Sequence, residues 1–121
     1  MKKFVGALLA GAVMTASFAG AALAEGKTIA VSWKTFQEER WKTDEAAIKA
    51  VVEAAGNKYI STDAQGSAAK QLTDIEGLVS QKVDVILVVA FDSDAILPAF
   101  QTAADAGVKM ISYDVLVEHP D

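Results

Sequence analysis

The 121-residue sequence contains no cysteine, and this absence excludes several kinds of protein. Without cysteine there is no disulfide framework, no thiolate zinc site and no lipid-modified cysteine of the bacterial lipoprotein type. His119 is the single histidine, so the sequence predicts no metal site and no serine–histidine–aspartate triad. Glycine-rich phosphate loops of the Gly-x-Gly-x-x-Gly and Gly-x-x-x-x-Gly-Lys patterns are also missing. We therefore expect neither an enzyme nor a bound cofactor.

Positive charge is also scarce. Lysine and arginine total 11 against 16 acidic residues, which gives a formal net charge of −5. Lys2 and Lys3 lie in a leading segment without acids, so the remainder of the chain is more acidic still. An acidic surface repels phosphate backbones and anionic membranes, so we expect no nucleic-acid partner.

Residues 1–24 have the pattern of a secretory signal peptide. Lys2 and Lys3 precede an uncharged run over 4–23, and the small residues Ala22 and Ala24 suit signal peptidase. A transmembrane anchor needs ~20 strongly apolar residues, whereas glycine, serine and threonine dilute this run. We expect cleavage after Ala24 and a freely diffusing product in the periplasm of a Gram-negative bacterium.

Short apolar runs alternate with helical patterns along the rest of the chain. Strands are predicted at 27–33, 57–62, 83–90 and 108–113, with one amphipathic helix in each interval, the first from about Glu39 to Ala55. The third run is almost continuously apolar, as is typical of a strand that helices cover on both faces. Parallel strands need such crossovers, so the prediction is an α/β fold with a doubly wound parallel sheet.

Several residues mark the predicted helix ends. Gly66 and Ser67 are candidate start signals of the second helix. The third helix is expected to be capped by Asp92, Ser93 or Asp94, with Pro98 in its first turn. Gly56 and Gly107 are expected to end the first and third helices. The sequence stops at Asp121, just after the fourth predicted strand. We therefore expect residues 25–121 to be a fragment, the incomplete N-terminal lobe of a larger fold.

The loops that follow the strands hold the candidate binding residues, because ligands of open α/β sheets bind beyond the carboxyl ends of the strands. A carbohydrate has apolar C–H faces and a rim of hydroxyls, which aromatic rings and charged planar groups match. The residues of these types in the loops are Arg40, Trp41, Phe91, Asp92 and Asp114.

Each candidate also has a structural alternative. Trp41 shares an apolar stripe with Ile48 and can be a core residue. Asp92 can cap a helix. Arg40 and Asp114 can be solvated surface charges, and their spacing leaves both interpretations open.

Four segments give the chain a resemblance to a known family. They are Glu39-Arg40-Trp41, the 71–76 run Gln-Leu-Thr-Asp-Ile-Glu, the 83–89 run Val-Asp-Val-Ile-Leu-Val-Val, and the 107–114 run Gly-Val-Lys-Met-Ile-Ser-Tyr-Asp. Together they resemble the type 1 periplasmic sugar-binding proteins of ABC importers, most of all the xylose-binding branch. The resemblance extends over essentially all of residues 27–114.

This resemblance implies a two-lobed receptor that captures a monosaccharide and delivers it to a membrane permease. It implies that Arg40 and Trp41 touch the sugar, that Asp114 accepts sugar hydroxyls, and that Phe91 and Asp92 lie in a binding loop. It also implies a monomer that can interact with a chemoreceptor or sensor.

Val115 departs from the family, which usually has arginine after this aspartate. The preferred sugar then differs, or Arg40 supplies the missing polar contact, or the ligand is rhamnose-like or an autoinducer.

Overall fold

The computed structural model describes residues 25–120, and the predicted signal peptide lies outside them. Within this range, four strands alternate with three helices: β1 (Thr28–Trp33), α1 (Glu39–Ala54), β2 (Lys58–Asp63), α2 (Ala68–Ser80), β3 (Val85–Val88), α3 (Leu97–Asp105) and β4 (Lys109–Ser112). None of these helices combines the length and the apolar character that crossing a bilayer requires.

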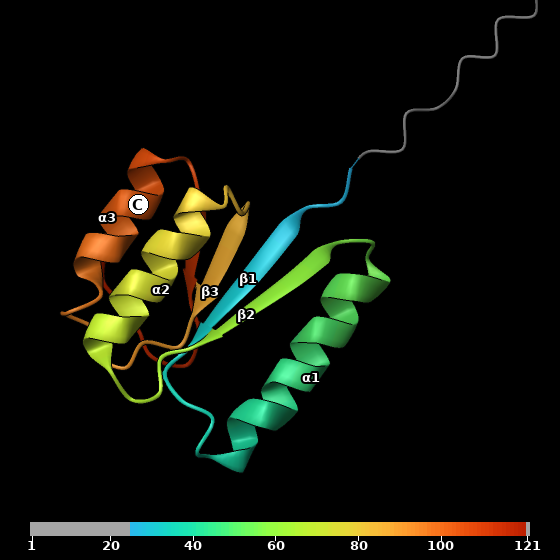
Figure 1. Cartoon of the computed structure of the whole chain (residues 1–121), viewed down its shortest axis with the longest axis horizontal. Coiled ribbons are helices and arrows are strands. Elements are labelled where there is room, and N and C mark those ends of the chain that lie inside the picture. The colour runs from blue at the N-terminus through green and yellow to red at the C-terminus, as the bar shows by residue number, and fades with distance from the viewer. Residues whose placement is uncertain (1–24, 121) are drawn as a thin grey trace, which may run out of the picture.

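The four strands form one parallel sheet in the order β2-β1-β3-β4. In Figure 1, α1 lies on one side of this sheet, and α2 and α3 lie on the other. β1 is central, with Val31 opposite Ser61 on β2 and Leu87 on β3. The predicted doubly wound α/β layer is therefore confirmed.

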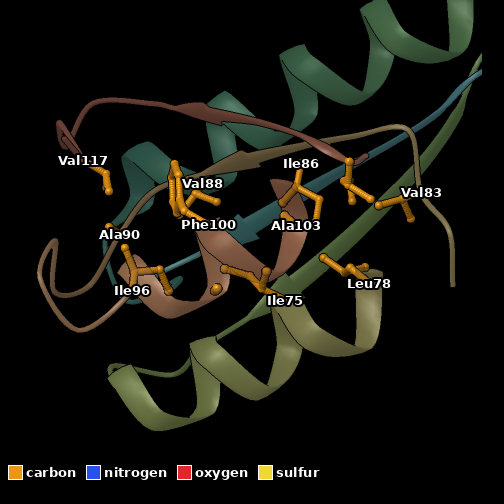
Figure 2. Close-up of a cluster of buried hydrophobic side chains, with 13 residues drawn as sticks. Ile75, Leu78, Val83, Ile86, Val88, Ala90, Ile96, Phe100, Ala103 and Val117 are labelled. Atoms are coloured by element: carbon orange, nitrogen blue, oxygen red, sulfur yellow. The ribbon is translucent and has the colours of Figure 1, made fainter. Parts of the chain in front are cut away.

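Side chains of the central strands alternate between two cores, because successive residues of a strand point to opposite faces. Ala30 faces the larger core and Val31 the smaller one. The larger core lies between the sheet and α2 and α3, and Figure 2 shows Ile75, Leu78, Ile86, Val88, Phe100 and Ala103 within it. The smaller core lies under α1 and is formed by Val31, Trp33, Trp41 and Val89, with Phe36, Ile48, Tyr59, Leu87 and Tyr113 packed around them.

The helix ends follow the residues that the sequence marked, with one exception. Gly56 and Gly107 come just after α1 and α3 with φ of 77° and 74°, a left-handed conformation that glycine adopts without strain. The Ser67 hydroxyl accepts a hydrogen bond from the Lys70 amide and caps α2.

The predicted cap of α3 by Asp92, Ser93 or Asp94 is wrong. The N-cap of α3 is Ile96, and no side chain caps this helix. Instead, Asp92 Oδ1 accepts hydrogen bonds from the amides of Asp94 and Ala95, at 3.0 and 2.9 Å. A separate turn at 92–96 therefore uses the carboxylate, and Pro98, which has no amide hydrogen to satisfy, lies in the first turn of α3.

Candidate functional site

The sheet has a topological switch point between β1 and β3. The chain leaves β1 through α1 toward β2, and it leaves β3 through α3 toward β4 on the opposite side. Doubly wound folds bind ligands at the carboxyl ends of strands whose connections diverge in this way. The candidate residues lie in the loops at this edge of the sheet.

Arg40 and Asp114 meet at this end of the sheet, although 74 residues separate them. Arg40 is in the first turn of α1, and its Nη2 lies 2.6 Å from Oδ1 of Asp114, which follows β4. The hydrogen bond to Asp114 raises the pKa of Arg40 further above its ordinary value. The side chains are 54% and 28% exposed, so the pair is open to solvent and to a ligand.

Asp44 and Tyr113 extend this pair into a cluster of four side chains. Asp44 Oδ2 lies 3.4 Å from Arg40 Nε and accepts a hydrogen bond of 2.9 Å from the Tyr113 hydroxyl. This bond to the carboxylate is the main reason why the pKa of Tyr113 is raised. Sequence reasoning missed both residues, although Arg40 and Asp44 have the i, i+4 spacing of ion pairs on a helix.

Trp41 lies beneath the guanidinium group of Arg40. The residue is 1% exposed, and the Arg40 guanidinium carbon lies 4.4 Å from the centroid of the indole ring. Lys34 Nζ lies 4.9 Å from the same centroid, and the Trp33 ring packs beside it at 6.0 Å. The burial matches the core-packing alternative, and the ring also supports Arg40 through a cation–π contact.

Asp114 is held in an unusual backbone conformation. Its φ is 66°, and the Val115 amide donates a 2.8 Å hydrogen bond to the Tyr113 carbonyl across it. An i to i+2 bond around a residue with positive φ is a γ-turn of the rare, strained class. Aspartate tolerates positive φ better than most residues. This turn directs the carboxylate toward Arg40.

Phe91 and Asp92 are placed in the loop after β3. Phe91 is 50% exposed, which leaves much of its ring available for contact. Asp92 is exposed too, but one of its carboxylate oxygens binds the backbone of its own loop. Among the described residues, no hydrogen bond or ion pair joins Asp92 to Arg40 or Asp114.

The cluster combines hydrogen-bond donors and acceptors suited to a neutral polyol. A guanidinium fork donates, two carboxylates accept, and an aromatic surface lies under them. Within residues 25–120, no group of three histidine, aspartate or glutamate side chains is placed to hold a metal ion. A set of donors and acceptors of this kind can form hydrogen bonds with the hydroxyl groups of a ligand.

Comparison with known proteins identifies a family and several relatives. The periplasmic binding protein domain family matches residues 29–121. The multiple sugar-binding periplasmic receptor ChvE of Rhizobium radiobacter is 31% identical over 98% of this chain and 34% of its own length. The D-xylose-binding periplasmic protein of Haemophilus influenzae is 24% identical over 86% of this chain and 31% of its own.

Solved structures share the fold as well. A carbohydrate transporter solute binding protein from Chloroflexus aurantiacus, in complex with D-glucose, matches with a TM-score of 0.71 and 31% identity, over 78% of this chain and 28% of that one. An ABC transporter solute binding protein from Mycobacterium smegmatis, with bound glycerol, matches with a TM-score of 0.75 and 28% identity, over 78% and 33% of the two chains.

The chain spans about a third of the length of the curated relatives it matches. Its match to the family nevertheless runs through every strand and helix of the described structure except the first residue of β1. The parallel four-stranded α/β sheet agrees with the fold of the structures it matches. The chain therefore belongs to the periplasmic binding protein family, with the type 1 fold.

Proposed function

We propose that this chain forms part of the substrate-binding component of a sugar ABC importer. It captures a monosaccharide in the periplasm, releases it to an inner-membrane permease, and catalyses no reaction. The observation that carries the proposal is the Arg40–Asp114 pair at the switch-point edge, 2.6 Å apart and open to solvent. The relatives named as sugar-binding periplasmic proteins support it.

In this proposal a sugar inserts its hydroxyls into the Arg40–Asp114 pair. One hydroxyl donates to the Asp114 carboxylate while a neighbouring oxygen accepts from the guanidinium of Arg40. Such charge-assisted hydrogen bonds are stronger than neutral ones, and the direct ion pair holds both groups ready beforehand. Asp44 and Trp41 fix the plane of the guanidinium, and the exposed ring of Phe91 offers a surface for the apolar C–H face. Asp92 contributes an exposed carboxylate from the same loop.

The proposal also includes a signal peptide, a second lobe and protein partners. A signal peptide over residues 1–24 is cleaved after Ala24, and residues 25–121 form part of the N-terminal lobe of a two-lobed receptor. The mature protein is a monomer that contacts a permease and, in some settings, a chemoreceptor or sensor. A second lobe closes over the sugar and makes the closed form recognisable to the permease.

The ligand is xylose-like in our first proposal, because D-xylose-binding proteins of two bacteria are among the relatives. A rhamnose-like or autoinducer ligand is the second candidate. The reason is Val115, an apolar side chain that cannot bridge sugar hydroxyls as the arginine usual in the family at this position would. Structures similar to this chain at 31% and 26% identity contain L-rhamnose and the autoinducer AI-2, respectively.

Calorimetric titration of the full-length protein with xylose, ribose, arabinose, glucose and rhamnose tests the proposal. We expect one of these sugars to bind, and Arg40→Ala or Asp114→Asn to weaken that binding by about 1–3 kcal/mol, because each leaves a ligand group unpaired. Asparagine also tolerates positive φ, so this variant keeps the γ-turn.

Lys42→Ala is the matched control, since Lys42 lies on the same helix and pairs with Glu39. It should bind like the wild type. Wild-type affinity in both Arg40→Ala and Asp114→Asn would remove this pair from the site.

A further inference from the structure

Gln71 is the largest polar side chain among the fully buried residues. It projects from α2, and both it and Ser32 on β1 are 0% exposed. A buried carboxamide costs free energy unless its donors and acceptor find partners. The position of these partners shows what Gln71 does in the fold.

The Gln71 carboxamide binds the two strands on either side of the switch point. Its Nε2 donates to the Val89 carbonyl at 2.9 Å and to the Ser32 hydroxyl at 3.2 Å. Its Oε1 accepts a 2.9 Å hydrogen bond from the Phe91 amide. One side chain therefore holds the carboxyl end of β1, the carboxyl end of β3 and the start of the following loop.

The backbone needs these partners because the sheet hydrogen bonding ends here. The Val89 amide donates to the Ser32 carbonyl at 2.9 Å, after which the two chains separate toward α1 and α3. Among the described residues, neither the Val89 carbonyl nor the Phe91 amide has a backbone hydrogen-bond partner. A side-chain carboxamide has the same kinds of donor and acceptor as a peptide group. Gln71 therefore gives these two backbone groups the hydrogen bonds that a neighbouring strand would otherwise supply.

We propose that Gln71 is a positioning residue of the ligand site, an inference that rests on the proposed sugar-binding function. By fixing the Phe91 amide, it determines the position of the half-exposed Phe91 ring and of the adjoining Asp92 at the candidate site. It touches no ligand itself, because it is entirely buried.

The substitution Gln71→Glu tests this role through pH. Burial raises the pKa of the introduced carboxyl group. When protonated, the group can still donate to the Val89 carbonyl and accept from the Phe91 amide. When ionised, it has no donor and places a negative charge beside the carbonyl and the Ser32 hydroxyl oxygen.

We expect the sugar affinity of full-length Gln71→Glu to approach the wild-type value in acid and to fall about tenfold as the carboxyl group ionises. Over the same pH step, amide hydrogen exchange of Phe91 should accelerate. Gln81→Glu is the control, since Gln81 is exposed at the end of the same helix and should show no such step. Circular dichroism at each pH verifies that the proteins are folded.

Gln71→Met provides a second variant without a buried charge. It should bind sugar about tenfold more weakly at every pH, because the Val89 carbonyl and the Phe91 amide lose their partner. Unchanged affinity in both variants, with the Phe91 amide exchanging faster, would overturn the positioning role and leave the proposed function standing. If the wild type binds no sugar, the proposed function fails, and the role of Gln71 toward sugar fails with it.

Discussion

Charged side chains at the two ends of the sheet have different tasks. At the carboxyl ends of the strands, Arg40 and Asp114 form an exposed pair that a ligand can enter. At the amino ends, Asp84 accepts a 2.8 Å hydrogen bond from the Thr28 amide and pairs with Lys27 at 3.2 Å. The first arrangement suits binding, whereas the second ties β1 to the segment that leads into β3. Charged pairs therefore suit ligand binding or stability according to the end of the strands at which they lie.

The carboxylate of Asp84 gives a prediction on pH. The Thr28 amide first, and Lys27 second, lower the pKa of Asp84. A carboxyl group with a lowered pKa in the folded state stabilises the protein above its unfolded pKa, and this contribution is lost as the pH falls through the folded value. In denaturant unfolding, the wild type should therefore have a larger free energy of unfolding than Asp84→Asn near neutral pH. This difference should shrink in acid. Asp105→Asn controls for the loss of one negative charge. A difference that grows in acid would contradict this assignment.

Among the elements, α1 and α2 are attached to the sheet in different ways. α2 buries Gln71, Ile75 and Leu78, and its first turn is capped by Ser67. α1 buries only Trp41, while Ile48 on the same apolar stripe is partly exposed. The apolar stripe that predicted α1 is therefore only partly covered in the described structure, although it correctly predicted a helix.

The caps give a prediction at the scale of the element. Ser67→Ala should lower the free energy of unfolding by about 1 kcal/mol, because the Lys70 amide loses its acceptor. Ser93→Ala is the control. Ser93 precedes α3, which no side chain caps, so this variant should stay within about 0.5 kcal/mol of wild type. Equal losses in chemical denaturation would show that the two serines act alike.

Across the whole molecule, the candidate site is a surface edge and not an enclosed cavity. Arg40 is 54% exposed, and the chain spans about a third of the length of its curated relatives. Water competes for exposed hydrogen-bonding groups, and enclosing a ligand strengthens each electrostatic contact with it. If this edge binds a sugar as proposed, an element that covers it would strengthen the binding.

A prediction follows for residues 25–121 produced alone. We expect calorimetry to find no micromolar affinity for xylose, arabinose, ribose or glucose, while the full-length protein binds one of the tested sugars. Micromolar binding by residues 25–121 alone would mean that this edge binds a sugar tightly without a second lobe.

Much of the fold could be predicted from the sequence, because secondary structure depends on local spacing. Helical periodicity placed α1 within a residue of its bounds, and the apolar run 83–90 contained β3. Ser67 and Gly107 marked helix ends, since caps depend on the neighbouring backbone alone. The prediction that Asp92 caps α3 failed for the same reason. An aspartate carboxylate can accept hydrogen bonds from any nearby turn, and here it accepts them from a turn that precedes α3.

The sequence by itself determined the alternation of strands and helices, the parallel α/β class and the loops in which binding residues could lie. Only the tertiary structure decided that Arg40 meets Asp114 across 74 residues, that Trp41 is buried beneath the pair, and that Gln71 joins two strand ends. The reason is physical. Periodicity and capping act between neighbours in the chain, whereas these contacts depend on the order in which strands pair and on the faces from which helices pack.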